Sequence, residues 1–249
     1  CGGTGGRIEL ILPKGVEVRA FALGYLPEEE SELADFGRIL RSPPGQPGRD
    51  YDLYRWDLMP SILIFDFRDY AVQDLYLRRL AFFVEKAGYK GRLMTDEELG
   101  SLHSWNAHDY RPEDLAAFFE LARTKGFPLN KEELALRSLL VERGVLRQKD
   151  QAYGPGSGAL ISISRESAPY LRTMFLTHES THGIFFADSE YRDYIRGIWA
   201  AMGKEEKWYW LLFLGWKEYD TSNSYLLANE YQAYLLQQVL PLVTDYFTK

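Results

Sequence analysis

Hydrophobic residues in the first half of the chain recur either at every second position, which predicts strands, or at every third to fourth position, which predicts helices. Alternating apolar residues at 7–12 and 16–23, on either side of a Pro-Lys-Gly turn, predict a strand pair. Residues 61–67 are almost continuously apolar, as in a strand buried on both faces. Apolar residues three to four apart predict helices at 28–40 and 72–87, with a proline- and glycine-rich loop between the first helix and the buried strand. In the second helix, the residues expected to face the core are Leu75, Leu80, Phe83 and Val84.

The middle of the chain predicts helices with recognisable ends. Residues 112–125 begin with a proline, which fits the first helical turn, and Asn130 with a glutamate three residues later predicts a capped helix at 131–143. After a glycine-rich turn, residues 159–164 alternate apolar and hydroxyl side chains, which favours a half-exposed strand, although an ordinary core strand fits the same residues. From residue 168 onward the apolar spacing is helical almost throughout.

Strands early in the chain and helices late in it are typical of an α+β fold. We expect a flexible tether at 1–6, an α/β lobe with a mixed sheet at 7–110 and a mainly helical lobe at 111–249, or one continuous domain over 7–249. With 249 residues, 46% of them hydrophobic, the chain can bury a sizeable core. Its formal net charge of −7 and scattered basic residues argue against a nucleic-acid partner. The longest apolar stretch, 208–216, is too short to cross a bilayer.

The helical segment contains the pattern H-E-x-x-H, formed by His178, Glu179 and His182. Residues four apart project from one face of a helix, so both imidazoles can reach one ion while Glu179 stands beside the open coordination position. Zinc hydrolases use this pattern, with the glutamate as general base for an activated water. Two histidines on an ordinary amphipathic helix are the alternative. The apolar flanks favour a metal, because unpaired polar groups in a buried helix are costly.

A catalytic zinc usually has three protein ligands, so the third must come from elsewhere in the chain. Asp188 follows His182 by six residues, but Phe185 occupies the position, three residues past His182, where a glycine would turn the chain back to the metal. A continuing helix would carry Asp188 about 9 Å along its axis. Asp188 fits better as the N-cap of a helix at 189–202. Glu230 is the stronger candidate, because it lies on the apolar face of a predicted helix, where a carboxylate needs a partner. A surface or salt-bridged glutamate is the alternative.

The two histidines and Glu230, preceded by Asn229, resemble the metal-binding residues of the gluzincins, the thermolysin-like branch of zinc peptidases. The resemblance covers roughly the last third of the chain. It departs in a longer spacing before the glutamate and in Tyr234, which replaces the usual aspartate. The resemblance implies a zincin-like fold and a peptide substrate that adds to the free edge of the strand before the active-site helix, here 159–164. It assigns the Zn²⁺ ligands as His178, His182 and Glu230.

The developing oxyanion of the substrate needs a donor besides the metal. The candidates are Tyr234, which is close to Glu230 in sequence, and His108, which Asp109 could orient. A loop histidine with only local hydrogen bonds is the alternative for His108. Further candidates in the same two segments are Tyr225, Tyr231 and His103.

The first residues resemble the mature end of a bacterial lipoprotein, with Cys1 followed by a glycine-rich stretch at 2–6. The resemblance implies a lipid on Cys1, a tethered protein in the cell envelope and no membrane-spanning segment. A trimmed chain that happens to begin there is the alternative. Because Cys1 is the only cysteine, no intrachain disulfide can form.

The function predicted from these patterns is that of a zinc-dependent metallopeptidase acting on a protein or peptide substrate. Two alternatives remain open at this point. One is an envelope lipoprotein that binds a partner on a zincin scaffold without turnover. The other is a zinc hydrolase of a non-peptide amide, such as cell-wall material, because the pattern defines the nucleophile and not the substrate.

Overall fold

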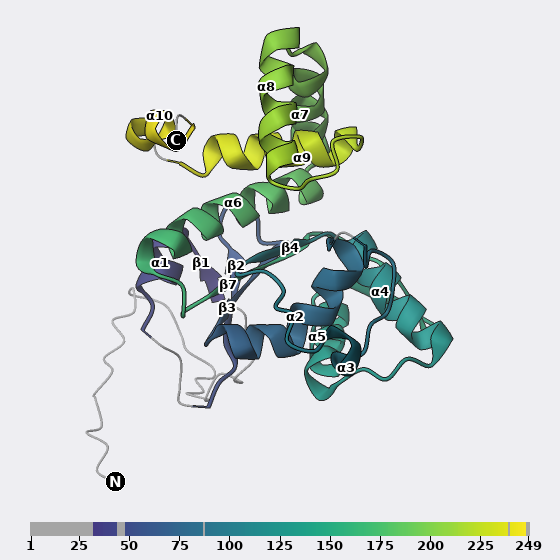
Figure 1. Ribbon diagram of the computed structural model, residues 1–249. Coiled ribbons are helices and arrows are strands. Elements are labelled where there is room, and N and C mark those ends of the chain that lie inside the picture. The colour runs from purple at the N-terminus through teal and green to yellow at the C-terminus, as the bar shows by residue number, and fades with distance from the viewer. Residues whose placement is uncertain (1–31, 44–47, 87, 239, 248–249) are drawn as a thin grey trace, which may run out of the picture. The chain divides into compact units, whose positions relative to one another are not determined.

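The computed structural model describes residues 32–43, 48–86, 88–238 and 240–247, which fall in one unit, Ser31–Lys249 (Figure 1). The predictions for the first residues lie outside this part of the chain. These are the tether at 1–6, the lipid on Cys1, the strands at 7–12 and 16–23, and the start of the helix at 28–40.

A mixed sheet of five strands forms the centre of this unit, in the order β1-β2-β3-β7-β4. β1 (Glu32–Ala34) runs parallel to β2 (Tyr51–Trp56), which is antiparallel to β3 (Ile62–Phe67). β3 runs parallel to β7 (Ala159–Ser164), and β4 (His108–Tyr110) closes the row antiparallel to β7. The mixed sheet, followed by a mainly helical second half, agrees with the predicted α+β class.

β7 corrects the prediction of a half-exposed strand at residues 159–164. All six of its residues are buried, and it lies between β3 and β4 rather than at an edge. Its hydroxyl side chains are compatible with burial because they have hydrogen-bond partners: Gln73 Nε2 donates to Ser162 Oγ at 2.9 Å, and the Glu166 N–H donates to Ser164 Oγ at 3.2 Å. The core strand, the alternative interpretation of the same residues, is the one that the structure contains.

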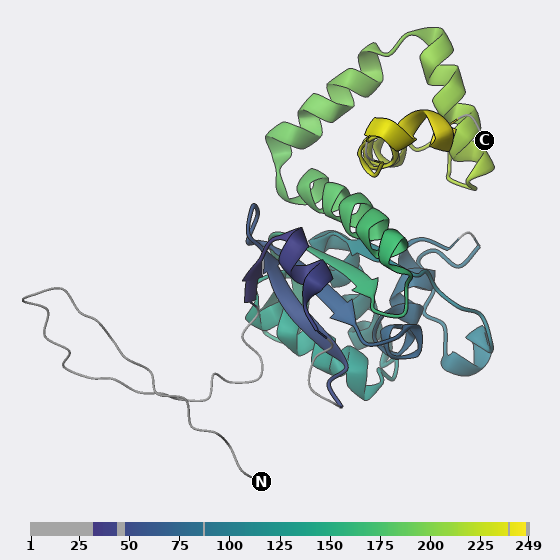
Figure 2. The same cartoon turned by 90° about the vertical axis from the view of Figure 1, so that its left-hand side faces the viewer.

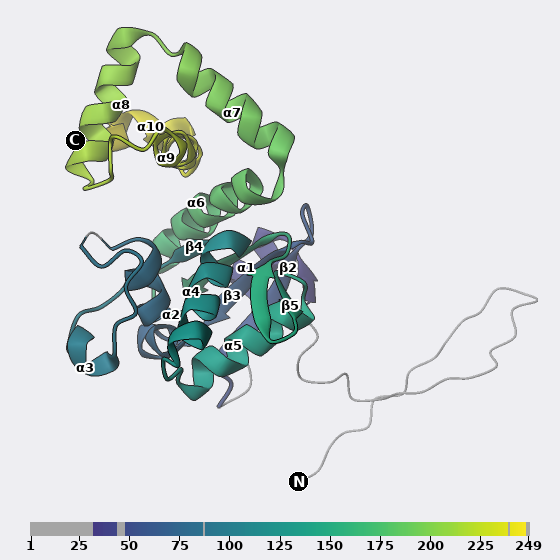
Figure 3. The same cartoon turned by 90° about the vertical axis from the view of Figure 1, so that its right-hand side faces the viewer.

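Helices cover both faces of the sheet, as Figure 2 and Figure 3 show from two sides. Alternate residues of β3 point to opposite faces. On one face they pack with α2 (Tyr70–Val84), α4 (Pro112–Lys125) and α5 (Lys131–Glu142). On the other they pack with α1 (Phe36–Arg41) and α6 (Pro169–Ala187).

The predicted helix bounds agree best with the structure where a proline or a capping box marks the first turn. α4 has the predicted bounds, and α5 begins at the predicted residue behind a capping box, in which Asn130 Oδ1 accepts from the Glu133 N–H at 2.7 Å. Leu75 was predicted to face the core but is exposed on α2. Asp35 caps α1, so the helix begins at Phe36 and residues 32–34 pair with β2 instead of continuing the predicted helix.

Smaller elements join these layers. α3 (Asp96–Leu99) lies between α2 and β4 in the chain. β5 (Leu146–Lys149) and β6 (Ala152–Pro155) form a two-stranded hairpin, and β6 overlaps the start of the glycine-rich turn that was predicted at 153–158.

The last part of the chain is helical, as predicted, and has its own aromatic core. α6 is followed by α7 (Ser189–Ala201), α8 (Lys204–Trp216), α9 (Ser224–Leu236) and α10 (Leu240–Phe247). Asp188 caps α7, which confirms its predicted role as an N-cap. No helix among the described residues is long and apolar enough to cross a membrane. The buried side chains of this core are Phe185, Ile195, Trp199, Trp210, Leu214, Leu227 and Ala228.

Candidate metal centre

The H-E-x-x-H residues lie on α6, which is held against the sheet at two points. Near the start of α6, the Arg172 guanidinium donates two hydrogen bonds to the buried Asp66 carboxylate on β3, at 2.7 and 3.0 Å. Near its end, Gly183 lets the helix approach β3, because a Cβ at this position would lie 2.9 Å from Ile62 Cδ1. These two contacts therefore fix the position and direction of α6, which carries the two histidines, relative to the sheet.

His178, His182 and Glu230 converge on one point, with α9 packed against α6. The two imidazole Nε2 atoms are 3.1 Å apart, and each lies 3.7 Å from Glu230 Oε2. A triangle with these sides has a circumradius of about 2.0 Å, so one point lies about 2.0 Å from all three atoms. That distance fits the roughly 2.0–2.2 Å of zinc–nitrogen and zinc–oxygen bonds. The side chains are 12%, 1% and 8% exposed, respectively.

Two polar atoms of this triad lack the hydrogen-bond partners that such burial requires. Glu230 Oε2 and His182 Nδ1 are buried and have no hydrogen-bond partner among the described residues. Burial raises the pKa of Glu230 to about 7, although the nearby His182 opposes the shift. Burial, and then the neighbouring His182, lower the pKa of His178 well below its usual range. Although burial opposes the shift, the pKa of His182 is raised, because the negative charges of Asp109 and Glu230 together outweigh the effect of burial. Once deprotonated, two imidazoles and a carboxylate form a donor set that zinc accepts, so these residues fit a zinc ion.

Gln237 orients His178. Its Oε1 atom accepts a hydrogen bond from His178 Nδ1 at 2.9 Å, which leaves Nε2 directed toward Glu230. Such outer partners fix the tautomer and the direction of metal-binding histidines. Sequence reasoning missed Gln237, because the resemblance pointed to the position of Tyr234, three residues earlier, for this role.

Glu179 shares the site with Asp109, which β4 contributes. Ligand atoms of Asp109, Glu179 and His182 lie within 4.8 Å of one another. Burial, and then the negative charges of Asp109 and Glu85, raise the pKa of Glu179 well above its usual range. Asp109 entered the sequence analysis only as the neighbour of His108, since nothing in a three-residue strand indicates which side chain faces a distant helix.

Two tyrosines border the triad. The Tyr234 ring meets the His178 ring edge-on, with centroids 4.9 Å apart, and its hydroxyl lies 3.3 Å from that of Tyr219. Tyr219 also lowers the pKa of the Glu230 carboxyl, against the larger effect of burial. Tyr234 is thus at the site, as its position four residues after Glu230 predicts. Tyr219, in the loop before α9, was not anticipated.

Other donor candidates lie elsewhere. Tyr225 packs on Phe185 with ring centroids 5.2 Å apart, and Tyr231 packs on Trp210 at 4.9 Å, so both belong to the helical core. His103 lies at the surface beside Asp74.

The structure does not bring His108 into contact with the triad. His108 and Asp109 are neighbours on β4, so their side chains point to opposite faces of the sheet. The His108 side chain is buried, with Nδ1 3.0 Å from the Tyr110 hydroxyl and Nε2 3.4 Å from Ser104 Oγ. Burial lowers the pKa of His108 to about 3, so its imidazole is neutral. These contacts match the alternative of local hydrogen bonds.

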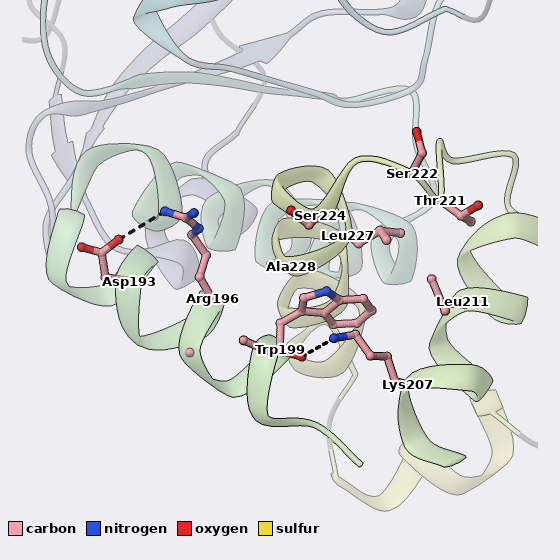
Figure 4. Close-up of a pocket in the computed structure, with 12 residues that line it drawn as sticks. Asp193, Arg196, Trp199, Lys207, Leu211, Thr221, Ser222, Ser224, Leu227 and Ala228 are labelled. Atoms are coloured by element: carbon pink, nitrogen blue, oxygen red, sulfur yellow. Dashed lines mark hydrogen bonds and ion pairs between the residues drawn. The ribbon is translucent and has the colours of Figure 1, made fainter. Parts of the chain in front are cut away.

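A hollow in the surface lies apart from these residues. It has a volume of about 610 Å³ and is bounded by α7, α8, α9 and the loop before α9 (Figure 4). Its charged side chains already have partners: Lys207 Nζ donates to the Trp199 carbonyl oxygen at 3.1 Å, and Arg196 pairs with Asp193 at 3.6 Å. Because neither His178 nor Glu230 lines it, this hollow does not belong to the candidate metal centre.

The three donors of the triad fit one metal ion, and the Glu179 carboxyl and the hydroxyls of Tyr219 and Tyr234 lie close to them. Comparison of the chain with protein-family models, curated proteins and solved structures yields no match.

Proposed function

We propose that the protein is a zinc-dependent peptidase of gluzincin type. The observation that carries the proposal is the meeting of three donor atoms from α6 and α9 around a point about 2.0 Å from each. Two features support the thermolysin-like assignment: the third ligand comes from a later helix, and the H-E-x-x-H helix lies across a mixed sheet. The zincin-like fold is part of this proposal.

Each residue has a separate task in hydrolysis. When bound, zinc supplies a Lewis acid that acidifies water and polarises the scissile carbonyl. Glu179 takes a proton from the attacking water while the water oxygen bonds to the carbonyl carbon. Glu179 then passes this proton to the amine nitrogen as the C–N bond breaks. Tyr219 and Tyr234 offer hydroxyl donors for the developing oxyanion. Gln237 keeps His178 in the tautomer that presents Nε2.

The position of β4 supports a peptide as the substrate. Among the described residues, β4 pairs with a strand on one side only, and its Asp109 lies next to Glu179. An extended peptide that adds to this edge uses main-chain hydrogen bonds, which hold it regardless of its sequence. The edge strand proposed for the substrate is therefore β4, in place of residues 159–164.

Metal analysis combined with a base substitution tests the proposal. We expect about one zinc per purified chain, and chelator-sensitive cleavage of peptides from a mixed library. Glu179→Gln should retain zinc and lower kcat by about 10²–10⁴-fold, the usual contribution of a general base. Glu97→Gln, at an exposed glutamate on α3, is the matched control and should cleave like the wild type.

Other outcomes separate the alternatives. A zinc-loaded protein that binds peptides but cleaves none would favour a non-catalytic binder. Cleavage restricted to cell-wall amides would favour the second alternative. A chain that binds no zinc would contradict the proposal.

A further inference from the structure

The loop that leads into β4, residues 101–107, is held against α2 by hydrogen bonds. His103 Nδ1 lies 2.7 Å from Asp74 Oδ2 on α2, and its Nε2 lies 3.1 Å from Asn106 Oδ1. Ser104 Oγ donates to Asp74 Oδ1 at 2.5 Å. These polar contacts fix the loop at the start of the edge strand on which the proposed substrate lies.

Trp105 presents an aromatic ring on this loop, and the residue is 45% exposed. The Lys86 ammonium lies 3.2 Å from the centre of the ring. The same ammonium donates to the Ser104 carbonyl oxygen at 3.1 Å, which holds it against one face of the indole. The exposed area of the side chain therefore belongs to the opposite face and to the ring edges. A rigid aromatic surface of this kind can bind another ring with little loss of side-chain freedom.

The chain places Trp105 close to the reacting groups. Trp105 precedes Asp109 by four residues, which span at most about 14 Å. Asp109 lies next to the proposed base, Glu179. An extended peptide rises about 3.3 Å per residue, so a substrate paired with β4 passes Trp105 within about four residues of its scissile bond.

The loop before α9 lies near the same pair of side chains. Burial lowers the pKa of Lys86, and the negative charge of Glu218 is among those that oppose this shift. Glu218 precedes Tyr219, whose hydroxyl lies 3.3 Å from that of Tyr234 at the triad. The pair formed by Lys86 and Trp105 is therefore within electrostatic reach of the loop that supplies Tyr219.

Lys86 also determines which ligand the open face of Trp105 accepts. The face of an indole ring is electron-rich, and the Lys86 ammonium already occupies one side of it. A second cation on the opposite side would be repelled by this ammonium across the ring. A neutral aromatic ring, stacked with an offset or edge-on, meets no such repulsion and gains the apolar contact. The open face therefore favours phenylalanine or tyrosine over arginine or lysine.

We infer that Trp105 forms a subsite for a neutral aromatic side chain of the peptide substrate, within four residues of the scissile bond. The inference rests on the proposed peptidase function and names a determinant of its specificity. Because the Trp105 ring belongs neither to the triad nor to the base, it acts on substrate binding and not on bond breaking.

The experiment uses alanine-rich peptides built around a scissile bond that the mixed library identifies. Phenylalanine is placed in turn at each of four positions on either side of that bond, and leucine and arginine are then tested at the positions where it improves binding. Cleavage gives kcat and KM, and fluorescence anisotropy with zinc-loaded Glu179→Gln protein gives the Kd. The variants are Trp105→Ala and Trp105→Phe. The matched control is Trp208→Ala, at a tryptophan that is 64% exposed on α8.

We expect one position at which phenylalanine lowers KM and Kd at least about fivefold relative to alanine, with little change in kcat. Leucine should gain less, and arginine should bind no better than alanine. Trp105→Ala should remove the preference for phenylalanine, Trp105→Phe should keep part of it, and Trp208→Ala should keep all of it. A zinc content equal to that of the wild type shows that each variant is folded.

Three results would contradict the inference. A profile without a preference for phenylalanine, or with a preference that survives in Trp105→Ala, would overturn the subsite and leave the peptidase standing. Equal gains from arginine and phenylalanine would overturn the choice of a neutral aromatic ligand. Absence of zinc binding and of cleavage would overturn the proposed function together with the subsite.

Discussion

Removal of the Asp66 carboxylate tests how the sheet holds the helix of the metal site. Asp66 is 0% exposed and accepts two hydrogen bonds from Arg172, whose side chain is 9% exposed. Arg165 also reaches Asp66 at 3.0 Å, but it keeps a second partner in Asp52 at 2.6 Å. The substitution Asp66→Ala therefore leaves one buried guanidinium, that of Arg172, without its counter-charge.

Breaking a buried pair in this way costs about 3–5 kcal/mol, because the remaining charge stays desolvated. At about 2–4 °C per kcal/mol for a chain of this size, the midpoint of thermal unfolding should fall by roughly 6–20 °C. Urea unfolding followed by circular dichroism measures the free energy of unfolding. The control is Asp114→Ala, which breaks the more exposed pair with Arg111 and should cost less than about 1 kcal/mol.

A double substitution separates loss of the pair from general damage to the core. Asp66→Leu combined with Arg172→Met replaces both charges with apolar groups and should recover much of the lost stability. If Asp66→Ala unfolds within about 1 kcal/mol of the wild type, the pair does not anchor α6 and the reasoning is refuted.

Three further predictions concern the metal site and its support. Replacing Gln237 with alanine should weaken zinc binding by about 10–100-fold, because His178 loses the hydrogen-bond partner at 2.9 Å that orients it. Chelator competition measures the zinc affinity. An unchanged affinity would show that Gln237 does not orient His178 for the metal. Gly183→Ala places a methyl group 2.9 Å from Ile62 Cδ1 and should cost about 1–3 kcal/mol in urea unfolding, with relief from Ile62→Val. Zinc at about a thousand times its Kd should stabilise the wild type by about 4 kcal/mol, and Glu230→Gln should lose most of this gain, as thermal unfolding with and without chelator would show.

Features encoded within a few residues could be predicted from the sequence. The spacing of His178 and His182 puts two imidazoles on one helix face, whatever the rest of the fold does. Asn130 and Glu133 mark the start of α5 through their own hydrogen bonds, and Asp188 does the same for α7. Glu230 was a candidate because a carboxylate on an apolar helix face needs a partner.

Only the tertiary structure decided what depends on pairing between distant segments. Apolar and hydroxyl residues alternate at 159–164, as in a half-exposed strand, yet this strand lies between β3 and β4. The order of strands in a sheet depends on pairing between distant segments, which the local sequence pattern does not reveal. Asp109 reaches Glu179, and Gln237 reaches His178 from 59 residues away, through the packing of β4 and of the end of α9 near α6. The chain's local patterns thus specify which side chains can bind a metal, and the sheet and helix packing specify which groups surround it.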